Sequence, residues 1–178
     1  ADSGEDAIAY CDEDGYASNV ETVATFLLEE NTPEATQVLH KVKTPAAGTI
    51  DALTKHLKVA PEQILKVLIV EGDDEPIALA LRGDHELNAI KVQNLAGIAS
   101  PMKIMDPNTI RKVIGCDTGF IGPINLDIAI YFDHATRQMS DFICGANATG
   151  VHYAGVNFGR DRDLPKTFDI RNVVEGDP

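Results

Sequence analysis

Residues 67–81 read Val-Leu-Ile-Val-Glu-Gly-Asp-Asp-Glu-Pro-Ile-Ala-Leu-Ala-Leu, so two apolar runs flank an acidic stretch that contains a glycine and a proline. Each run is too short for a buried helix, and turn-forming residues separate them. The pattern therefore predicts a β-hairpin with strands over 67–70 and 77–81. Segments of helical and of extended character alternate before and after it, which predicts an α/β or α+β core.

Helices are expected where apolar residues recur at helical spacing after a capping residue. We expect a helix after Thr49, a short turn opened by Pro61, a helix over 86–95 that ends at Gly97, and a helix from Asp106-Pro107 to about Ile114 that stops at Gly115. Further extended segments are expected at 7–11, 20–28, 37–42, 126–132 and 151–158.

The acidic charge of the chain is unevenly placed. The formal net charge is −13, and residues 1–40 hold ten acids and no Lys or Arg, so they contribute −10 and residues 41–178 contribute −3. Non-specific nucleic-acid binding needs a positive patch that releases counterions. The composition therefore excludes a surface that wraps a duplex, but it allows contact with one nucleotide at a strand end.

The length and the cysteines indicate one ordinary core. A chain of 178 residues usually forms a single domain and buries roughly 70% of its unfolded surface. Cys11, Cys116 and Cys144 are odd in number and widely spaced, which argues against a disulfide framework or a zinc site and favours reduced thiols. No segment has the ~20 apolar residues of a membrane span or the pattern of a signal peptide, so a cytoplasmic chain is expected.

Few residues suggest chemistry by themselves. The five histidines are scattered, so we expect no metal site. Glycines in the stretch from Gly119 to Pro123 would let backbone amides form a nest for an anion or an oxyanion; without further context a plain helix-to-strand connection is the better interpretation. Lys66 precedes the apolar run at 67–70, where most such lysines reach water. His152 in its strand is by itself more often structural than functional.

Several motifs together resemble the insertion domain of bacterial-type prolyl-tRNA synthetase, a relative of the YbaK-like aminoacyl-tRNA deacylases. The similarity covers essentially the whole chain, and the motifs stand in the order of that family. They are Leu81-Arg-Gly-Asp-His-Glu-Leu-Asn88, Gly119-x-x-x-Pro123, Met139-Ser-Asp-Phe142, Gly145-Ala-Asn147 and Asp169-Ile-Arg-Asn-Val-Val174.

This resemblance implies a fold and an activity. The expected fold is a mixed, largely antiparallel sheet or a partly closed barrel surrounded by helices. The expected activity is post-transfer editing, the hydrolysis of alanine mischarged onto proline tRNA. A synthetic pocket sized for proline cannot strongly reject the smaller alanine, and a second, smaller site supplies the missing discrimination.

The resemblance also implies roles for individual residues. The essential lysine of the family falls on Lys66, which would hold the phosphate or ribose of the terminal adenosine. The loop Gly119-Phe120-Ile121-Gly122-Pro123 would stabilise the oxyanion through its amides, and with no side-chain nucleophile evident, a ribose hydroxyl of the substrate would help to orient or activate the water. The small amino-acid pocket falls on Thr44, Ile50, Leu53, Asp133 and His152, with His152 as the size gauge that excludes proline mainly by steric clash.

The resemblance divides the chain into three segments. Residues 1–36 resemble the class II synthetase core before the insertion, 37–168 the editing domain, and 169–178 the return to the core. The expected partners are the tRNA acceptor end, whose terminal adenosine carries alanine, and the rest of the synthetase, with no DNA and no membrane. Editing needs no cofactor; ATP and magnesium belong to the synthetic site of the parent ligase.

Two alternatives remain open at the level of sequence. The segment could be a non-catalytic insertion that props the synthetase core or binds the acceptor end. It could also be a free-standing deacylase for another amino acid, such as cysteine, although the flanking segments that resemble the synthetase core argue against this.

Overall fold

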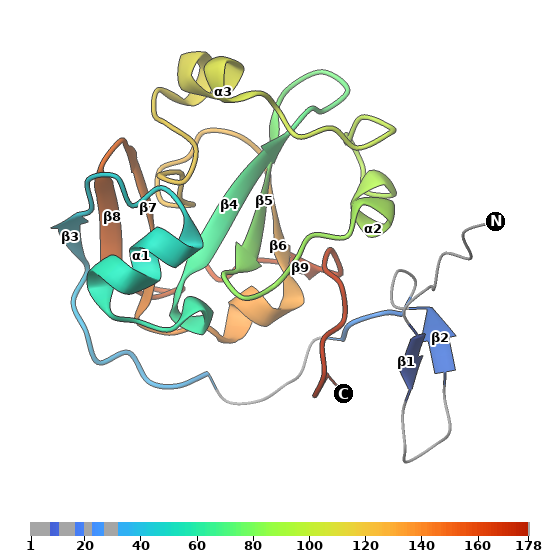
Figure 1. The fold of residues 1–178 in the computed structure, drawn as a ribbon, viewed down its shortest axis with the longest axis horizontal. Helices are drawn as coiled ribbons and strands as arrows, with labels where there is room; N and C mark the ends of the chain where they lie inside the picture. The colour runs from blue at the N-terminus through green and yellow to red at the C-terminus, as the bar shows by residue number, and fades with distance from the viewer. Residues whose placement is uncertain (1–7, 11–16, 20–22, 27–31, 178) are drawn as a thin grey trace.

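The computed structural model of the chain describes residues 8–10, 17–19, 23–26 and 32–177 (Figure 1). Its elements combine antiparallel and parallel strands with short helices, as expected for an α/β or α+β fold. In chain order they are β1 (Ile8–Tyr10), β2 (Ala17–Asn19), β3 (His40–Lys43), α1 (Ile50–Leu57), a 3-10 turn (Pro61–Gln63), β4 (Leu65–Val70), β5 (Ile77–Arg82), α2 (Ala89–Gln93), α3 (Pro107–Ile114), β6 (Ile130–Asp133), a second 3-10 turn (His134–Gln138), β7 (Phe142–Ala148), β8 (Val151–Val156) and β9 (Thr167–Phe168).

The predicted hairpin is confirmed and forms the centre of the larger sheet. Strands β4 and β5 are antiparallel, with Val67 opposite Ala80 and Leu68 opposite Leu79. Because side chains alternate along a strand, Val67 and Ala80 enter one core cluster, whereas Leu68 and Leu79 lie on the opposite face in another. The hairpin is therefore covered on both faces, which explains why its strands are apolar throughout.

Two main sheets meet beside this hairpin. The first has the order β4-β5-β6-β9, in which β5, β6 and β9 are parallel, and the second has the antiparallel order β3-β8-β7. A bridge between Ile64 and Ile143 joins the two at β4 and β7. Within the described residues the strands do not close into a barrel, so the mixed, largely antiparallel sheet is the correct form of the two expected.

The helices begin and end largely where the sequence predicts. The Thr49 side chain accepts a hydrogen bond from the Ala52 amide at the start of α1. Asp106 caps α3 in the same way, and that helix ends at Gly115 in the left-handed conformation, with φ 90°. Of the covering elements, α1 packs over the β3-β8-β7 sheet through Leu53, and α2 covers the far face of the β4-β5 hairpin through Val92.

Some predicted boundaries are wrong. The helix expected over 86–95 is reduced to α2, because Asn88 accepts from the Lys91 amide and starts the helix there, while Leu87 pairs with Arg171 in an isolated bridge. The strand expected over 126–132 begins only at Ile130, where pairing with Ala78 starts. The strands expected at 37–42 and 151–158 are found at His40–Lys43 and Val151–Val156.

The strand expected over 20–28 is also wrong where the structure describes it. Residues 23–26 are not a strand; instead the Thr25 hydroxyl donates to the Asp169 carboxylate at 2.7 Å, and the extended segment is β2 at Ala17–Asn19. The remainder of that prediction, and Cys11, lie outside the described residues. Strand β7 was not predicted, because Gly145, Ala146 and Asn147 are poor strand formers. Strand β9 was also not predicted, because it has only two residues.

The C-terminal segment packs into the larger sheet. Ile170 is fully buried in the cluster under α2, and the Arg171 guanidinium lies 3.3 Å from the Asp133 carboxylate. These contacts cross the predicted boundary between residues 168 and 169.

Cys116 and Cys144 are free and buried. Among the described residues there is no helix of the length and apolarity that crossing a membrane requires.

We expect Gly145→Ala to destabilise the fold strongly. A Cβ atom there would lie 2.2 Å from the Phe120 carbonyl carbon, so the backbone must shift, at a cost of at least about 2 kcal/mol. The control is Gly159→Ala, where a Cβ atom would meet no atom within 4 Å. Gly159 has φ +86°, and we expect alanine in this conformation to cost about 1 kcal/mol. Denaturant unfolding measures both; an equal or smaller loss for Gly145→Ala would contradict the close approach.

Candidate functional site

The loop from Gly119 to Pro123 lies between the two sheets. Phe120 and Ile121 are buried in the cluster formed by both sheets, so the loop is part of the core rather than a surface connection. Gly119 has φ +94°, and a Cβ atom there would lie 1.9 Å from the carbonyl oxygen of Gly48. This position therefore requires glycine for its conformation and for its close packing.

Part of the amide nest is already occupied. The Phe120 amide donates to the Asp117 carbonyl at 3.2 Å, and the Gly122 amide donates to the Asn147 side-chain oxygen at 2.9 Å. Pro123 has no amide hydrogen. The described residues supply no acceptor for the amides of Gly119 and Ile121, which are therefore the loop amides without an internal hydrogen bond.

His152 on β8 holds the start of this loop. Its Nε2 lies 3.1 Å from the Gly119 carbonyl oxygen, and its Nδ1 lies 2.6 Å from the Thr44 hydroxyl. A carbonyl only accepts, so Nε2 carries the proton and Nδ1 accepts from Thr44. Burial of the ring, which is 2% exposed, lowers the pKa of His152, although the bond to Gly119 opposes this shift. The neutral ring is thus the form that fits this site.

Four predicted pocket residues lie together beside the loop. The Phe120 and His152 rings are 5.3 Å apart. Ile50 and Leu53 of α1 belong to an apolar cluster with Ala47 and Ala154. Ala47 follows Thr44 by three residues, and Ala154 follows His152 by two residues on β8. The structure therefore brings Thr44, Ile50, Leu53 and His152 to one side of the loop.

Lys66 lies on the hairpin, on the face that also carries Leu68. Its ammonium donates to the carbonyl oxygens of Gly83 and His85, the former at 3.4 Å. Burial lowers the pKa of Lys66, and the charges of Glu86 and Asp84 oppose that shift. Ile64, two residues earlier on the same face, belongs to the apolar cluster under α1, so Lys66 stands at the border of that cluster.

Asp133 is separated from the other predicted pocket residues. Its side chain is fully buried, accepts from the Ala135 amide at 3.0 Å and pairs with Arg171. Burial raises the pKa of Asp133, and hydrogen bonding to Ala135 and the charge of Arg171 oppose the shift. Phe132 of β6 pairs with Ala80 of β5, so the next residue, Asp133, lies beside Leu81. Leu81 in turn pairs with Lys66 of β4, and the three residues form one row across the sheet.

Sequence reasoning missed a buried polar network that surrounds Arg171, the partner of Asp133. Arg82 donates to His85 Nε2 at 3.0 Å, and Arg171 binds Asp177 at 2.7 Å. Burial and the charges of Arg171 and Arg82 lower the pKa of His85 to about 4. His85 Nδ1 and Arg171 Nε are buried without a hydrogen-bond partner among the described residues. The Leu81–Asn88 motif contained His85, but its spacing alone indicates no partner.

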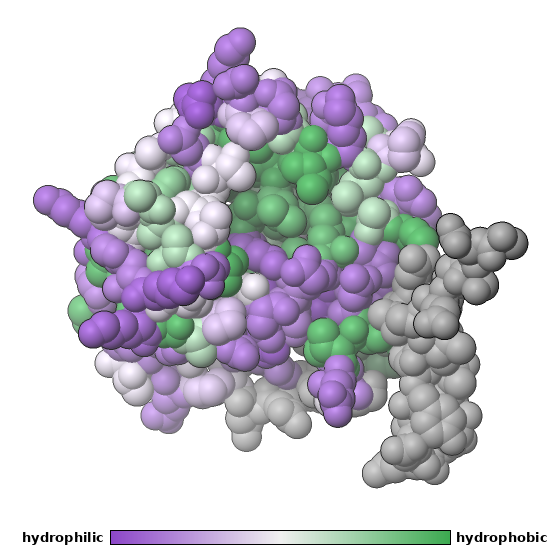
Figure 2. Space-filling model, in the orientation of Figure 1, coloured by the Kyte–Doolittle hydropathy of each residue, from purple (hydrophilic) through white to green (hydrophobic). Residues whose placement is uncertain are grey.

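A hollow lies over the β4-β5 hairpin. Figure 2 shows hydrophobic residues gathered at its base, over β4 and β5 between α1 and α2. Leu68 and Met102 are partly buried in the cluster beneath this face, and Ile104 is half exposed. The hollow therefore lies on the same face of β4 as Lys66.

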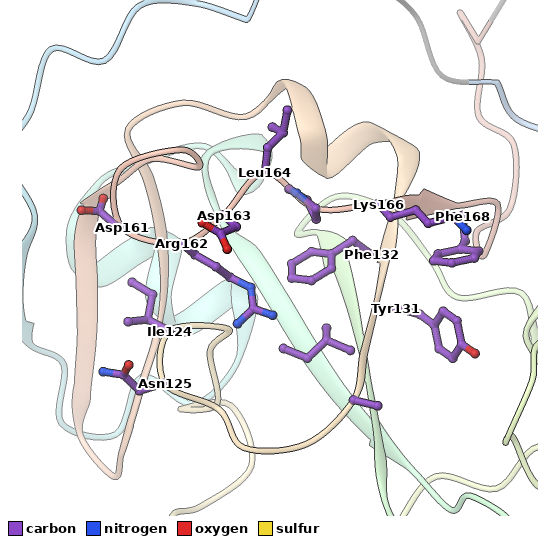
Figure 3. Close-up of a pocket in the computed structure, with 13 residues that line it drawn as sticks. Ile124, Asn125, Tyr131, Phe132, Asp161, Arg162, Asp163, Leu164, Lys166 and Phe168 are labelled. Atoms are coloured by element: carbon purple, nitrogen blue, oxygen red, sulfur yellow. The ribbon is translucent and has the colours of Figure 1, made fainter.

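A separate pocket of about 800 Å³ lies at the β6-β9 edge (Figure 3). It contains none of the predicted site residues. Arg162 lies over the Phe132 ring and donates to the Pro123 carbonyl, while Tyr131 packs edge-on against Phe168. The polar and aromatic groups of this pocket are thus largely engaged with one another.

Comparison with known proteins gives a consistent result. Residues 44–161 match the profile of a family described as the aminoacyl-tRNA editing domain. The chain is 44% identical over its whole length to a proline-tRNA ligase of Chromobacterium violaceum, of which it spans 32%. It therefore covers about a third of that curated relative.

Solved structures share the fold at low sequence identity. A proposed trans-editing enzyme for prolyl-tRNA synthetase is 18% identical, with a TM-score of 0.59 over 76% of this chain and 87% of that one. A scaffold used for computational epitope grafting has a TM-score of 0.63 at 17% identity, over 76% of this chain and 88% of that one. A hypothetical protein has a TM-score of 0.56 at 21% identity, over 65% and 79%.

We expect Thr44→Val to lower the free energy of unfolding by about 1–3 kcal/mol, because it leaves His152 Nδ1 buried without its donor. Thr54→Val is the control, since the Thr54 hydroxyl bonds an exposed helix carbonyl; its change should stay within about 0.5 kcal/mol. Thermal unfolding compares the two. Equal losses would show that the Thr44–His152 bond does not stabilise the site.

The chain should lose stability between pH 6.5 and pH 4. Unfolded histidine takes up a proton below 6.5, whereas folded His85 resists protonation to about 4. The unfolded state thus binds more protons in this window, and acidification costs up to about 3 kcal/mol. His85→Gln should flatten the dependence measured by denaturant unfolding, and the exposed control His40→Gln should keep it. An unchanged slope in His85→Gln would exclude His85 as its cause.

Proposed function

The chain belongs to the aminoacyl-tRNA editing domain family, and from this membership we propose that it hydrolyses the ester of alanine mischarged onto proline tRNA. The observation that carries the proposal is the buried Gly119–Pro123 loop, in which two amides have no acceptor among the described residues and Gly119 is bound by a neutral histidine. In this proposal the chain is part of a proline-tRNA ligase, because its 44% identical relative is such a ligase and the chain spans about a third of it.

The loop amides supply the electrostatic part of the proposed reaction. Water attacks the ester carbonyl carbon, and the negative charge that develops on the carbonyl oxygen is stabilised by the amides of Gly119 and Ile121. The bond between that carbon and the ribose oxygen then breaks. A proton from the water passes to the ribose oxygen, alanine leaves as the acid, and a ribose hydroxyl orients the water. No side-chain nucleophile or cofactor enters this scheme.

Lys66 holds the terminal adenosine in this proposal. Its ammonium lies on the face of β4 that also carries Leu68 and borders the α1 cluster. Binding a phosphate or ribose oxygen there means exchanging the carbonyl contacts of Gly83 and His85 for contacts with the substrate. Partial burial strengthens such a contact relative to a lysine in bulk water.

The pocket residues set the size limit. In this proposal Thr44, Ile50 and Leu53 line the site with His152, whose ring is fixed by two hydrogen bonds and cannot be displaced without breaking them. A wall of this kind excludes proline sterically, since a difference of one methylene by itself decides only ~1–3 kcal/mol. Asp133, which shares a row of the sheet with Lys66, takes part through its ion pair with Arg171.

The partners follow from the same proposal. The chain meets the acceptor end of the tRNA and the rest of the synthetase, in the cytoplasm. ATP and magnesium serve the synthetic site of the parent. A non-catalytic insertion would not need a neutral histidine and two amides without an internal acceptor beside an apolar cluster. A free-standing deacylase for another amino acid is the remaining alternative, and the choice of substrate in the assays decides it.

We expect the chain to release alanine from alanyl-tRNA of proline specificity, and Lys66→Ala to reduce the rate by at least about 100-fold through loss of substrate positioning. Lys66→Arg should recover only part of the rate, because a guanidinium does not replace a compact ammonium. Release of labelled alanine is the measurement. The control is Lys103→Ala, since the Lys103 side chain is 70% exposed.

Thermal unfolding of each Lys66 variant separates loss of activity from loss of fold. A folded Lys66→Ala chain with the wild-type rate would remove Lys66 from the reaction. A wild-type chain that hydrolyses no alanyl-tRNA, but hydrolyses cysteinyl-tRNA, would instead support the free-standing alternative.

We expect His152→Ala to widen the range of amino acids released. Removing the ring opens space beside Phe120 and leaves the Gly119 carbonyl without its donor, so larger aminoacyl groups should be hydrolysed while the rate on alanine falls. A panel of mischarged tRNAs measures this. Unchanged selectivity in a folded variant would exclude His152 as the gauge.

A further inference from the structure

Asn147 on β7 binds the Gly119–Pro123 loop near the end opposite to the one that His152 binds. Its side-chain oxygen accepts from the Gly122 amide at 2.9 Å, and its side-chain NH2 donates to the carbonyl oxygens of Gly122 at 3.1 Å and Ile124 at 2.9 Å. Its backbone amide donates to the Phe120 carbonyl at 2.8 Å. One residue therefore makes four hydrogen bonds to the loop and its exit.

The backbone places this side chain by an irregularity in the hairpin of β7 and β8. Gly145 pairs with His152 and Ala148 with Val151, so two residues of β7 lie between pairs that are adjacent on β8. Asn147 is one of them and has φ 57°. Bulges of this kind re-aim a side chain and are frequent beside active sites, and asparagine tolerates the left-handed conformation better than most residues.

The same hairpin thus holds both ends of the loop. His152 on β8 binds the Gly119 carbonyl, and Asn147 on β7 binds Gly122. We propose that Asn147 is a positioning residue, which fixes the loop so that the Gly119 and Ile121 amides face the ester oxygen in the editing reaction. This inference rests on the proposed function of the chain.

The contacts support positioning rather than direct chemistry. Asn147 occupies the Gly122 amide, so that amide is not available to substrate, and its other bonds go to carbonyls of the loop. An oxyanion donor acts only when it stands at the right place before the reaction, and a displacement of about 1 Å costs on the order of 100-fold in rate. Loss of these hydrogen bonds should therefore slow the chemical step more than it weakens substrate binding.

The test uses variants that keep the backbone conformation. Asn147→Gly accepts φ 57° but removes every side-chain bond. Asn147→Asp keeps an acceptor for the Gly122 amide and loses both donors. The matched control is Asn125→Gly, because Asn125 has the same φ of 57° but is exposed and makes none of the hydrogen bonds described for the loop.

The measurements are kcat and KM for alanyl-tRNA of proline specificity, and hydrogen exchange of the Gly122 amide by NMR. In Asn147→Gly we expect kcat to fall about 10- to 100-fold with KM within about 3-fold, and the Gly122 amide to exchange faster. Asn147→Asp should give an intermediate kcat with Gly122 still protected. Asn125→Gly should match the wild type in both readouts.

Three results would overturn the proposal. These are a wild-type kcat in folded Asn147→Gly, a rise confined to KM, or a Gly122 amide that stays protected without the side chain. A wild-type chain that hydrolyses no aminoacyl-tRNA would refute the proposed function and the catalytic part of this inference together. The exchange rate of Gly122 would still decide, independently, whether Asn147 holds the loop.

Discussion

The close approach of two backbone segments is the constraint on which the rest of this structure depends. The Gly119–Pro123 loop passes so near to Gly145 of β7 that a Cβ atom there would lie 2.2 Å from the Phe120 carbonyl carbon. A Cβ atom at Gly119 would lie 1.9 Å from the Gly48 carbonyl oxygen. Glycines at these contacts let the loop enter the core between the two sheets. Its apolar side chains are then buried, and its free amides and the bonds from the β7-β8 hairpin follow from that position.

The charge distribution fits the proposed contact with only the end of a nucleic acid. Ten of the formal thirteen net negative charges belong to residues 1–40, and residues 41–178 are close to balance. Within the described part, Thr25 binds Asp169, and Lys91 binds Asp169 at 2.9 Å, so the segments that precede and follow the editing fold are tied together beside α2. The same region holds Arg171 and His85, and through the carbonyl of His85 it contacts Lys66. Contacts to the flanking segments and to the candidate nucleotide site thus share one polar network.

The sequence predicted those parts of the fold that local chemistry decides. The apolar hairpin and the caps at Thr49 and Asp106 are confirmed because strand burial and capping depend on a few neighbouring residues. Strand β7 was missed because its Gly145-Ala146-Asn147 stretch is shaped by the bulge and by packing on the loop, which are tertiary effects. The resemblance placed Thr44, His152 and Gly119 in one site, and the structure brings them together. The structure separates Asp133 from these residues. Asp133 lies on β6 of the larger sheet, and its position there is fixed by the pairing of β6 with β5, which the sequence does not reveal.

The most direct test of the account is an NMR titration of the chain with adenosine that carries alanine at the 3′ position through an amide, which the enzyme cannot hydrolyse as an ester. We predict the largest shifts at the amides of Gly119 and Ile121, at the His152 ring and at the Lys66 side chain. Shifts confined to the β6-β9 pocket, at Tyr131, Arg162 and Phe168, would contradict the assignment of the loop as the editing site.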